Sequence, residues 1–303
     1  NQDMKDFWKN LFFFKVSLFK LFLNFLLYEV LKNKINNSHK IIYPYEEKTF
    51  ERSINNFSKQ FKFKNVFAYC VNPQDKLAYF LKEYSNLDVP RSNKYLFCGK
   101  RYQFFFRKLN KKNIIKNELS TIGSFKGKKI NFQYEEKNFF LVLISHPKEI
   151  INFFNFLLEE KKLLKFRYLI RDYPHSNNSK LIVDLIKKNS LNDFVKVSNN
   201  SFKKDCIKTK ATIFSATSAG IQAINYSKIG IWSNLSGIGM TPFFDDYKNY
   251  FPSSNSVNLY KNLNIISELN KKQYFKLLKK QQFSSNQIYS IINELNVKKI
   301  FLK

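Results

Sequence analysis

The sequence predicts an α/β protein with two domains, each built around a parallel sheet. A length of 303 residues suits two domains of ordinary size. Short β-branched or aromatic runs alternate with longer amphipathic runs, and a polar, lysine-rich stretch separates two such series. Hydrophobic residues make up 44% of the chain, which is enough apolar surface for a real core. The chain is therefore expected to be globular and not a disordered polyelectrolyte.

The first series predicts the N-terminal domain, residues 1–137. Expected strands cover residues 41–45, 66–70 and 95–98, and expected helices cover 49–61, 75–84 and 101–109. The polar residues 110–134 contain Gly123 and Gly127, so we expect the crossing between the domains near residues 110–138. Because the chain starts at Asn1 and enters an apolar run directly, we expect this domain to be incomplete.

The opening residues 7–31 are the most hydrophobic part of the chain. Lys9, Lys20 and Asn24 recur in them at helical spacing, which indicates an amphipathic helix. Charges at its centre argue against a membrane span, and a signal-peptide cleavage pattern is missing. The helix is expected either to pack on the domain or to lie on a membrane surface.

The second series predicts the C-terminal domain, residues 138–303. FFLVLIS at residues 139–145 is a continuous apolar run, as expected for a strand buried on both faces. Expected strands cover residues 139–145, 166–171, 194–197, 211–215 and 229–233, with helices at 149–163, 180–188, 202–208 and 219–226. Two further helices are expected within residues 277–295. Five strands with four intervening helices predict one doubly wound domain.

Charge and cysteine usage limit the partners. The net charge of +29 favours phosphorylated substrates or acidic membranes, but it is spread along the chain without a nucleic-acid-binding motif, so no nucleic acid is expected. Cys70, Cys98 and Cys206 are odd in number and lack metal-ligand spacing, so neither disulfides nor a metal site is expected. A reducing, cytoplasmic setting fits this usage.

Residues 215–223, SATSAGIQA, form a strand end, a hydroxyl-rich turn and a helix N-terminus. Unpaired N–H groups at such a terminus attract phosphate, and Thr217 and Ser218 add hydroxyl donors. Gly220 would allow the helix to approach the sheet closely. The alternative is that Thr217 or Ser218 only caps the helix.

The loop RDYPHSN, residues 171–177, follows the second strand of the same sheet. Arg171 and His175 could neutralise a phosphate, and His175 could protonate a leaving group. The alternative is an exposed loop histidine without a role. The segment matters because we expect it to open at the same sheet edge as the SATSAGIQA turn.

In the first domain, YPYEEKTFER at residues 43–52 places Glu46 and Glu47 at a strand end and in the first turn of a helix. The helix dipole alone can explain carboxylates there. Facing a cleft, one of them could act as general base for a sugar hydroxyl.

Together these segments resemble glycosyltransferases of the GT-B fold, specifically bacterial surface-carbohydrate biosynthesis proteins. YPYEEKTFER is similar to an aromatic-Pro-aromatic-Glu pattern of that group, and YLFCG at 95–99 with Ile122-Gly123-Ser124 to its approach to the domain crossing. Residues 215–232 resemble the donor-binding segment. RDYPHSN is similar to a basic-x-His-Pro loop of bacterial sialyltransferases and related capsule enzymes, with Pro and His reversed.

The resemblance implies two Rossmann-like domains facing a cleft, with a nucleotide-sugar donor on the C-terminal domain and the acceptor on the N-terminal one. It implies no metal and no cofactor. Gln222 stands where a Glu often binds the donor ribose, and AYCVN at 68–72 lacks a histidine that relatives tend to carry. Both departures put the donor preference and the activity in question.

The expected function is transfer of a sugar to a cell-surface glycan or glycolipid, on the inner face of the plasma membrane as a peripheral protein. A CMP-sugar donor is favoured because of the RDYPHSN loop, with UDP- and GDP-sugars open. Two alternatives remain: a CDP-polyol phosphotransferase of the same fold, and a non-catalytic basic protein that binds membranes or nucleic acid.

Overall fold

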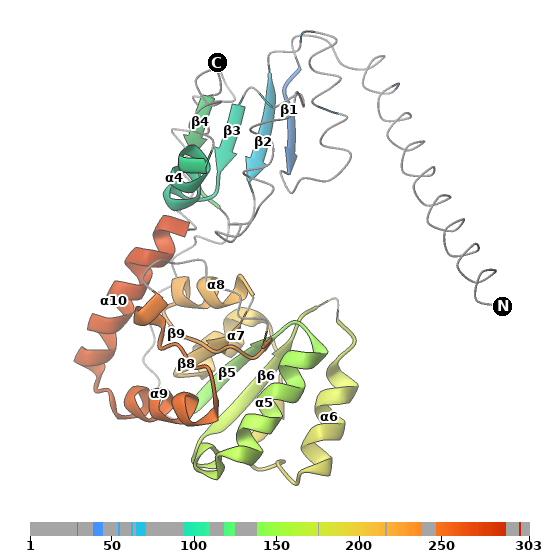
Figure 1. Ribbon diagram of the computed structural model, residues 1–303, viewed down its shortest axis with the longest axis vertical. Helices are drawn as coiled ribbons and strands as arrows, with labels where there is room; N and C mark the ends of the chain where they lie inside the picture. Colours follow the sequence, from blue (N-terminus) through green and yellow to red (C-terminus); the bar gives the residue numbers. More distant parts are fainter. Residues whose placement is uncertain are drawn as a thin grey trace, which may run out of the picture.

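The computed structural model describes two parallel sheets that lie at opposite ends of the molecule (Figure 1). The described residues are 29, 39–44, 54, 62, 65–70, 92, 94–109, 118–124, 138–174, 176–215, 217–237, 247–288 and 297. Of the helices expected at 7–31, 49–61 and 75–84, the described ranges include Glu29 and Ile54, both helical, and the rest lies outside them. None of the described helices is long and apolar enough to cross a membrane.

The N-terminal sheet has four parallel strands in the order β1-β2-β3-β4. They are β1 (Ile41–Pro44), β2 (Val66–Cys70), β3 (Lys94–Phe97) and β4 (Glu118–Thr121). The first three were predicted. Strand β4 was not, because its sequence ELST is polar and lies within the stretch that we interpreted as the domain crossing. The sheet therefore takes up part of that stretch.

Helix α4 (Lys100–Leu109) covers β3, as the sequence predicts for residues 101–109. Its buried Phe106 packs on Tyr95 and Phe97 of β3, at ring-centroid distances of 4.8 and 5.3 Å. This aromatic group anchors the helix to the sheet.

The C-terminal sheet has five parallel strands in the order β7-β6-β5-β8-β9, which confirms the predicted doubly wound arrangement. They are β5 (Phe139–Ile144), β6 (Arg167–Asp172), β7 (Val195–Val197), β8 (Ala211–Phe214) and β9 (Ile229–Trp232). The central strand β5 is almost wholly buried, as its apolar run predicts.

Four helices connect these strands at the predicted places. They are α5 (Pro147–Glu159), α6 (Ser179–Lys188), α7 (Phe202–Lys208) and α8 (Ala219–Asn225). One boundary was wrong. Helix α5 ends four residues early, at Glu159, because the carboxylate of Glu160 caps a short 3-10 helix, η2 (Lys161–Lys165), by accepting from the Lys162 N–H at 3.2 Å.

The chain then continues through η3 (Tyr247–Tyr250), α9 (Ser256–Glu268) and α10 (Lys271–Ile288). The sequence predicts two helices within residues 277–295. Helix α10 covers the first part of this range and begins earlier, at Lys271, whereas residues 289–296 lie outside the described ranges. Helix α9 was missed. Its buried stripe Leu259, Leu263 and Ile266 has the helical spacing that could have revealed it. Helix α10 also contacts α4, so it joins the two domains (Figure 1).

Candidate functional site at the sheet switch point

Strands β5 and β8 lie side by side, yet the chain leaves them in opposite directions. It moves from β5 to β6 and β7 on one side and from β8 to β9 on the other. Right-handed crossovers then place α5 and α8 on opposite faces of the sheet, which makes the carboxyl ends of β5 and β8 the switch point of the fold. Ligands of doubly wound domains bind at such a point. The candidate site is therefore built from the residues that follow these two strands.

At the end of β5 a capping box begins helix α5. The buried carboxylate of Glu149 accepts hydrogen bonds from the Ser145 N–H (2.8 Å), the Ser145 hydroxyl (3.0 Å) and the His146 N–H (3.2 Å). The His146 Nδ1 atom accepts from the Lys148 N–H at 3.2 Å. Because Nδ1 is an acceptor here, neutral His146 carries its proton on Nε2. The exposed ring therefore offers a donor at the switch point.

The turn that follows β9 packs against this helix start. Asn152 of α5 donates to the Leu235 carbonyl at 2.6 Å. Gly237 has φ +67, and a Cβ atom at that position would lie 3.8 Å from both Cε and Nζ of Lys148. The Lys148 ammonium is thus brought beside this turn, next to His146. The sequence analysis missed Lys148. Its position as the second residue of a helix that follows a buried strand was the available signal.

The turn after β8 is the second part of the site. The Thr217 hydroxyl accepts from the Ala219 N–H at 3.3 Å, one residue before the N-cap position of α8, which Ser218 occupies. The Ser218 side chain makes no capping bond to the helix. Both residues are half-buried, and Ala216 lies outside the described ranges. The turn thus keeps its hydroxyls at the carboxyl edge of the sheet.

Gly220 allows the close approach of α8 to β8 that we expected. A Cβ atom there would lie 2.1 Å from Cγ of the buried Phe214 ring. The helix must therefore move away from the sheet when any larger residue is introduced.

We expect Gly220→Ala to lower the free energy of unfolding by about 2 kcal/mol, since overpacking a core costs about 1–3 kcal/mol. Urea unfolding followed by circular dichroism measures it. The double variant Gly220→Ala with Phe214→Leu should recover part of the loss. A single variant as stable as the parent would contradict the tight contact.

Arg171 is the second-last residue of strand β6 and contacts α7 and the loop before it. Its Nη1 atom donates to the Asp205 carboxylate at 2.8 Å and to the Asn200 carbonyl at 2.7 Å. Its guanidinium also lies 5.7 Å from the centre of the Phe202 ring. Strand β6 is separated from β8 by β5, so Arg171 and the β8 turn open at the same edge, one strand apart.

Two aromatic side chains, Phe202 and Tyr226, lie between Arg171 and Gln222. Phe202 packs on Tyr226 with ring centres 5.5 Å apart, and the Gln222 amide donates to the Tyr226 hydroxyl at 3.4 Å. These contacts connect α7 with α8. The half-buried amide is thus held by its own helix.

The loop after β6 is organised by Asp172. Its carboxylate accepts from the Tyr173 N–H (2.9 Å), the Asn178 N–H (3.0 Å), the Asn178 side-chain amide (3.1 Å) and the Ser176 hydroxyl. His175 belongs to this loop but lies outside the described residues.

In the N-terminal domain, the carboxyl ends of β2, β3 and β4 gather around Tyr69. Its hydroxyl donates to the Gly123 carbonyl at 2.9 Å, next to the buried Ser124. Burial raises the pKa of Tyr69 above its usual value. The segment YLFCG and the Gly123-Ser124 pair are therefore neighbours at one sheet edge. Glu46 and Glu47 follow β1 towards this edge in sequence but lie outside the described residues.

The cysteines offer no reactive group. Cys70, Cys98 and Cys206 are buried thiols, and burial raises the pKa of Cys206 to about 12, so its thiol stays protonated at neutral pH. Within the described ranges, no group of three or more His, Cys, Asp or Glu side chains could hold a metal ion.

Comparison with known proteins finds similarity in structure alone. No protein-family model matches the sequence, and no curated protein matches it either. The chain is similar to TarM of S. aureus, crystallised as a mutant with Fondaparinux, alpha-GlcNAc-glycerol and UDP, with a TM-score of 0.56 and 12% identity. It is similar to the pneumococcal O-GlcNAc transferase GtfA, crystallised with UDP and GlcNAc (0.61, 12%), and to a glycosyltransferase of Rickettsia africae (0.57, 14%).

These matches cover 91%, 90% and 91% of this chain, respectively, and therefore include both domains. The chain spans 57% of the TarM structure, 59% of GtfA and 80% of the Rickettsia protein. The predicted fold class is thus confirmed: two Rossmann-like domains with parallel sheets, the GT-B architecture of these glycosyltransferases.

Proposed function

We propose that the chain is a glycosyltransferase that binds a nucleotide-sugar at the carboxyl ends of β5 and β8. The observation that carries the proposal is the meeting of His146, Lys148 and the turn at 233–237 at the switch point. A diphosphate there could accept hydrogen bonds from the His146 Nε2–H and from the Lys148 ammonium. Both would stabilise the negative charge that develops on the departing nucleotide.

The donor that we propose first is a UDP-sugar, since the structures of TarM and GtfA contain UDP. Preference for a CMP-sugar depends on the RDYPHSN loop alone and is the second choice. In either case Gln222 can offer an amide to a ribose hydroxyl, where a carboxylate would bind more strongly.

The reaction we propose is attack of an acceptor hydroxyl on the anomeric carbon. The hydroxyl would lose its proton to Glu46 or Glu47, and the nucleotide diphosphate would leave towards Lys148, with His175 as a further proton donor. Arg171, Thr217 and Ser218 would complete the phosphate-binding edge. The acceptor would be a surface glycan or glycolipid held by the N-terminal domain. The net charge of +29 and the apolar segment 7–31 support work at an acidic membrane surface.

Lys148→Ala is expected to weaken UDP binding about tenfold or more, because an exposed charge-assisted contact to phosphate contributes roughly 1.5 kcal/mol or more. Isothermal titration calorimetry with UDP, CMP, GDP and CDP measures both the affinity and the preferred nucleotide. Lys261→Ala removes the same charge from the exposed face of α9 and is the matched control, expected to bind like the parent.

Two results would refute the proposal. If the folded parent binds none of the four nucleotides, the chain is better explained as a non-catalytic basic protein. If it binds UDP and Lys148→Ala binds equally well, the nucleotide lies elsewhere.

A further inference from the structure

A pocket of about 470 Å³ opens at the opposite edge of the C-terminal sheet, beside the first residues of β5, β6 and β7. Its volume is that of a small-molecule site. Strand β5 is six residues long, so the two edges are roughly 17–20 Å apart at about 3.3 Å per residue. The pocket is therefore separate from the switch point, and the proposed transfer reaction does not use it.

The pocket exists because part of one sheet face is left uncovered. Phe139 and Arg167 are register partners on β5 and β6, so their side chains leave the same face. Arg171, further along β6 on that face, contacts α7. With seven residues, α7 is only about 10 Å long and contacts β5, too short to cover the start of β6 and β7 as well.

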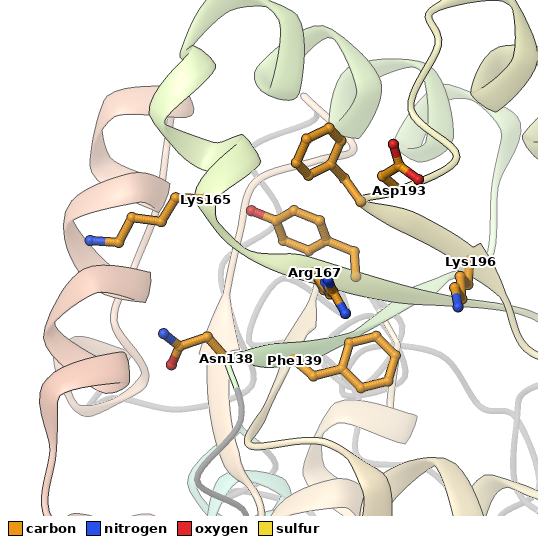
Figure 2. Close-up of a pocket in the computed structure, with 8 residues that line it drawn as sticks. Asn138, Phe139, Lys165, Arg167, Asp193 and Lys196 are labelled. Atoms are coloured by element: carbon orange, nitrogen blue, oxygen red, sulfur yellow. The ribbon is translucent and has the colours of Figure 1, made fainter.

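The lining combines aromatic surface with separate charges. Figure 2 shows Arg167 next to Phe139, with Lys196 and Asp193 to one side. Phe139 and Phe194 are half-buried, while Arg167, Lys196 and Asp193 are exposed. Among the described residues, none of these three charged side chains forms a hydrogen bond or an ion pair.

Other lining residues already have structural roles. Lys165 donates to the side chain of Asn264 at 2.6 Å and lies 5.4 Å from the centre of the Phe166 ring. It is thereby tied to α9. The groups that remain for a ligand are two cations, one carboxylate, the side-chain amide of Asn138 and the aromatic surface of Phe139 and Phe194.

We infer that this pocket binds an acidic oligosaccharide. The C–H face of a sugar ring packs on the negative face of an aromatic ring, which Phe139 and Phe194 offer. Arg167 and Lys196 suit carboxylate or sulfate groups on the sugar. Asp193 has only acceptors when ionised, so it suits sugar hydroxyls, which donate.

Asp193 also separates this ligand class from purely anionic ones. A carboxylate among the lining residues repels a polyphosphate chain, which offers no donors in return. That the sugar is the growing product of the enzyme rests on the proposed function; the binding itself does not.

The first measurement is calorimetric binding of an oligogalacturonate hexamer, with maltohexaose as the neutral counterpart. The parent should bind the acidic hexamer more tightly. The double variant Arg167→Ala with Lys196→Ala should weaken that binding about tenfold or more, since each lost charge-assisted contact contributes roughly 1.5 kcal/mol. The double variant Lys279→Ala with Lys280→Ala removes the same charge from the exposed face of α10 and should stay within about twofold of the parent.

The second measurement asks whether removing the Asp193 carboxylate weakens or strengthens binding of the hexamer. Asp193→Ala should weaken binding of the hexamer about threefold or more if the carboxylate accepts from sugar hydroxyls. A surface that merely attracts anions would bind the hexamer more tightly after this change, and that result, or an unchanged affinity, would overturn the inference. The inference would also be overturned if Arg167→Ala with Lys196→Ala and Lys279→Ala with Lys280→Ala lost the same affinity for the acidic hexamer. UDP affinity, measured on each variant, reports separately on the switch-point site and should not change.

Discussion

Replacing Arg171 with alanine should lower the free energy of unfolding by about 3–5 kcal/mol, the range found when one partner of a buried ion pair is removed. Asp205 is fully buried, and its carboxylate is held by the Arg171 guanidinium at 2.8 Å and by the Ser198 hydroxyl at 2.6 Å. Without the guanidinium, a negative charge would stay in the core with a single hydroxyl partner. Urea unfolding at neutral pH measures the loss.

The double variant Arg171→Met with Asp205→Leu removes both charges together and serves as the control. Because the unpaired charge is then gone, we expect most of the lost stability to return. Equal instability in the single and double variants would mean that packing of Arg171 on Phe202, and not the ion pair, holds α7 to β6.

The same double variant tests the role that the sequence suggests for Arg171. A phosphate contact predicts nucleotide binding about ten- to a hundredfold weaker than in the parent, even where stability has recovered. The ion pair with Asp205 leaves other N–H groups of the guanidinium to do this. An unchanged nucleotide affinity in the recovered variant would assign Arg171 to the fold alone.

Much of the C-terminal domain could be predicted from sequence because its strands are buried on both faces. Runs such as FFLVLI need no partner to be recognised, and turn residues mark their ends. Strand β4 and helix α9 could not be found in this way. The polar segment ELST forms a strand because it pairs with β3. The apolar stripe of α9 is interrupted by Asn side chains that point outward or form hydrogen bonds with the loop before the helix.

The candidate site shows a similar division. The edge of the sheet follows from the order of strands and helices, so Thr217, Ser218 and Gly220 could be assigned to it from sequence. Which groups face one another there depends on side-chain partners that are distant in the chain. The approach of Gly237 to Lys148 and the pairing of Arg171 with Asp205 are of this kind. No local sequence pattern predicts either of these two contacts.

The outer edge of strand β9, the last strand in the sheet order, is completed by a side chain, which leads to a second large effect. Gln281 of α10 is fully buried and mimics a neighbouring strand: its Oε1 accepts from the Gly230 N–H at 2.7 Å, and its Nε2 donates to the Gly230 carbonyl at 2.9 Å. The same Nε2 donates to the Asn249 carbonyl at 2.7 Å. The amide thus satisfies backbone groups of β9 that would otherwise have no strand beside them.

Gln281→Leu keeps the volume but removes all three hydrogen bonds, so we expect the free energy of unfolding to fall by about 3–4 kcal/mol, since each buried group left unsatisfied costs roughly 1–3 kcal/mol. Gln282→Leu, one residue along the helix and only half-buried, is the matched control and should cost about 1 kcal/mol, because the bonds of that amide are longer, at 3.3 and 3.4 Å. Hydrogen exchange adds a local readout. In Gln281→Leu the Gly230 amide should exchange faster than amides of the central strand β5, because its acceptor is gone while the core of the sheet remains. If Gly230 stays as protected as β5, another group has replaced the glutamine, and α10 does not close this edge through Gln281.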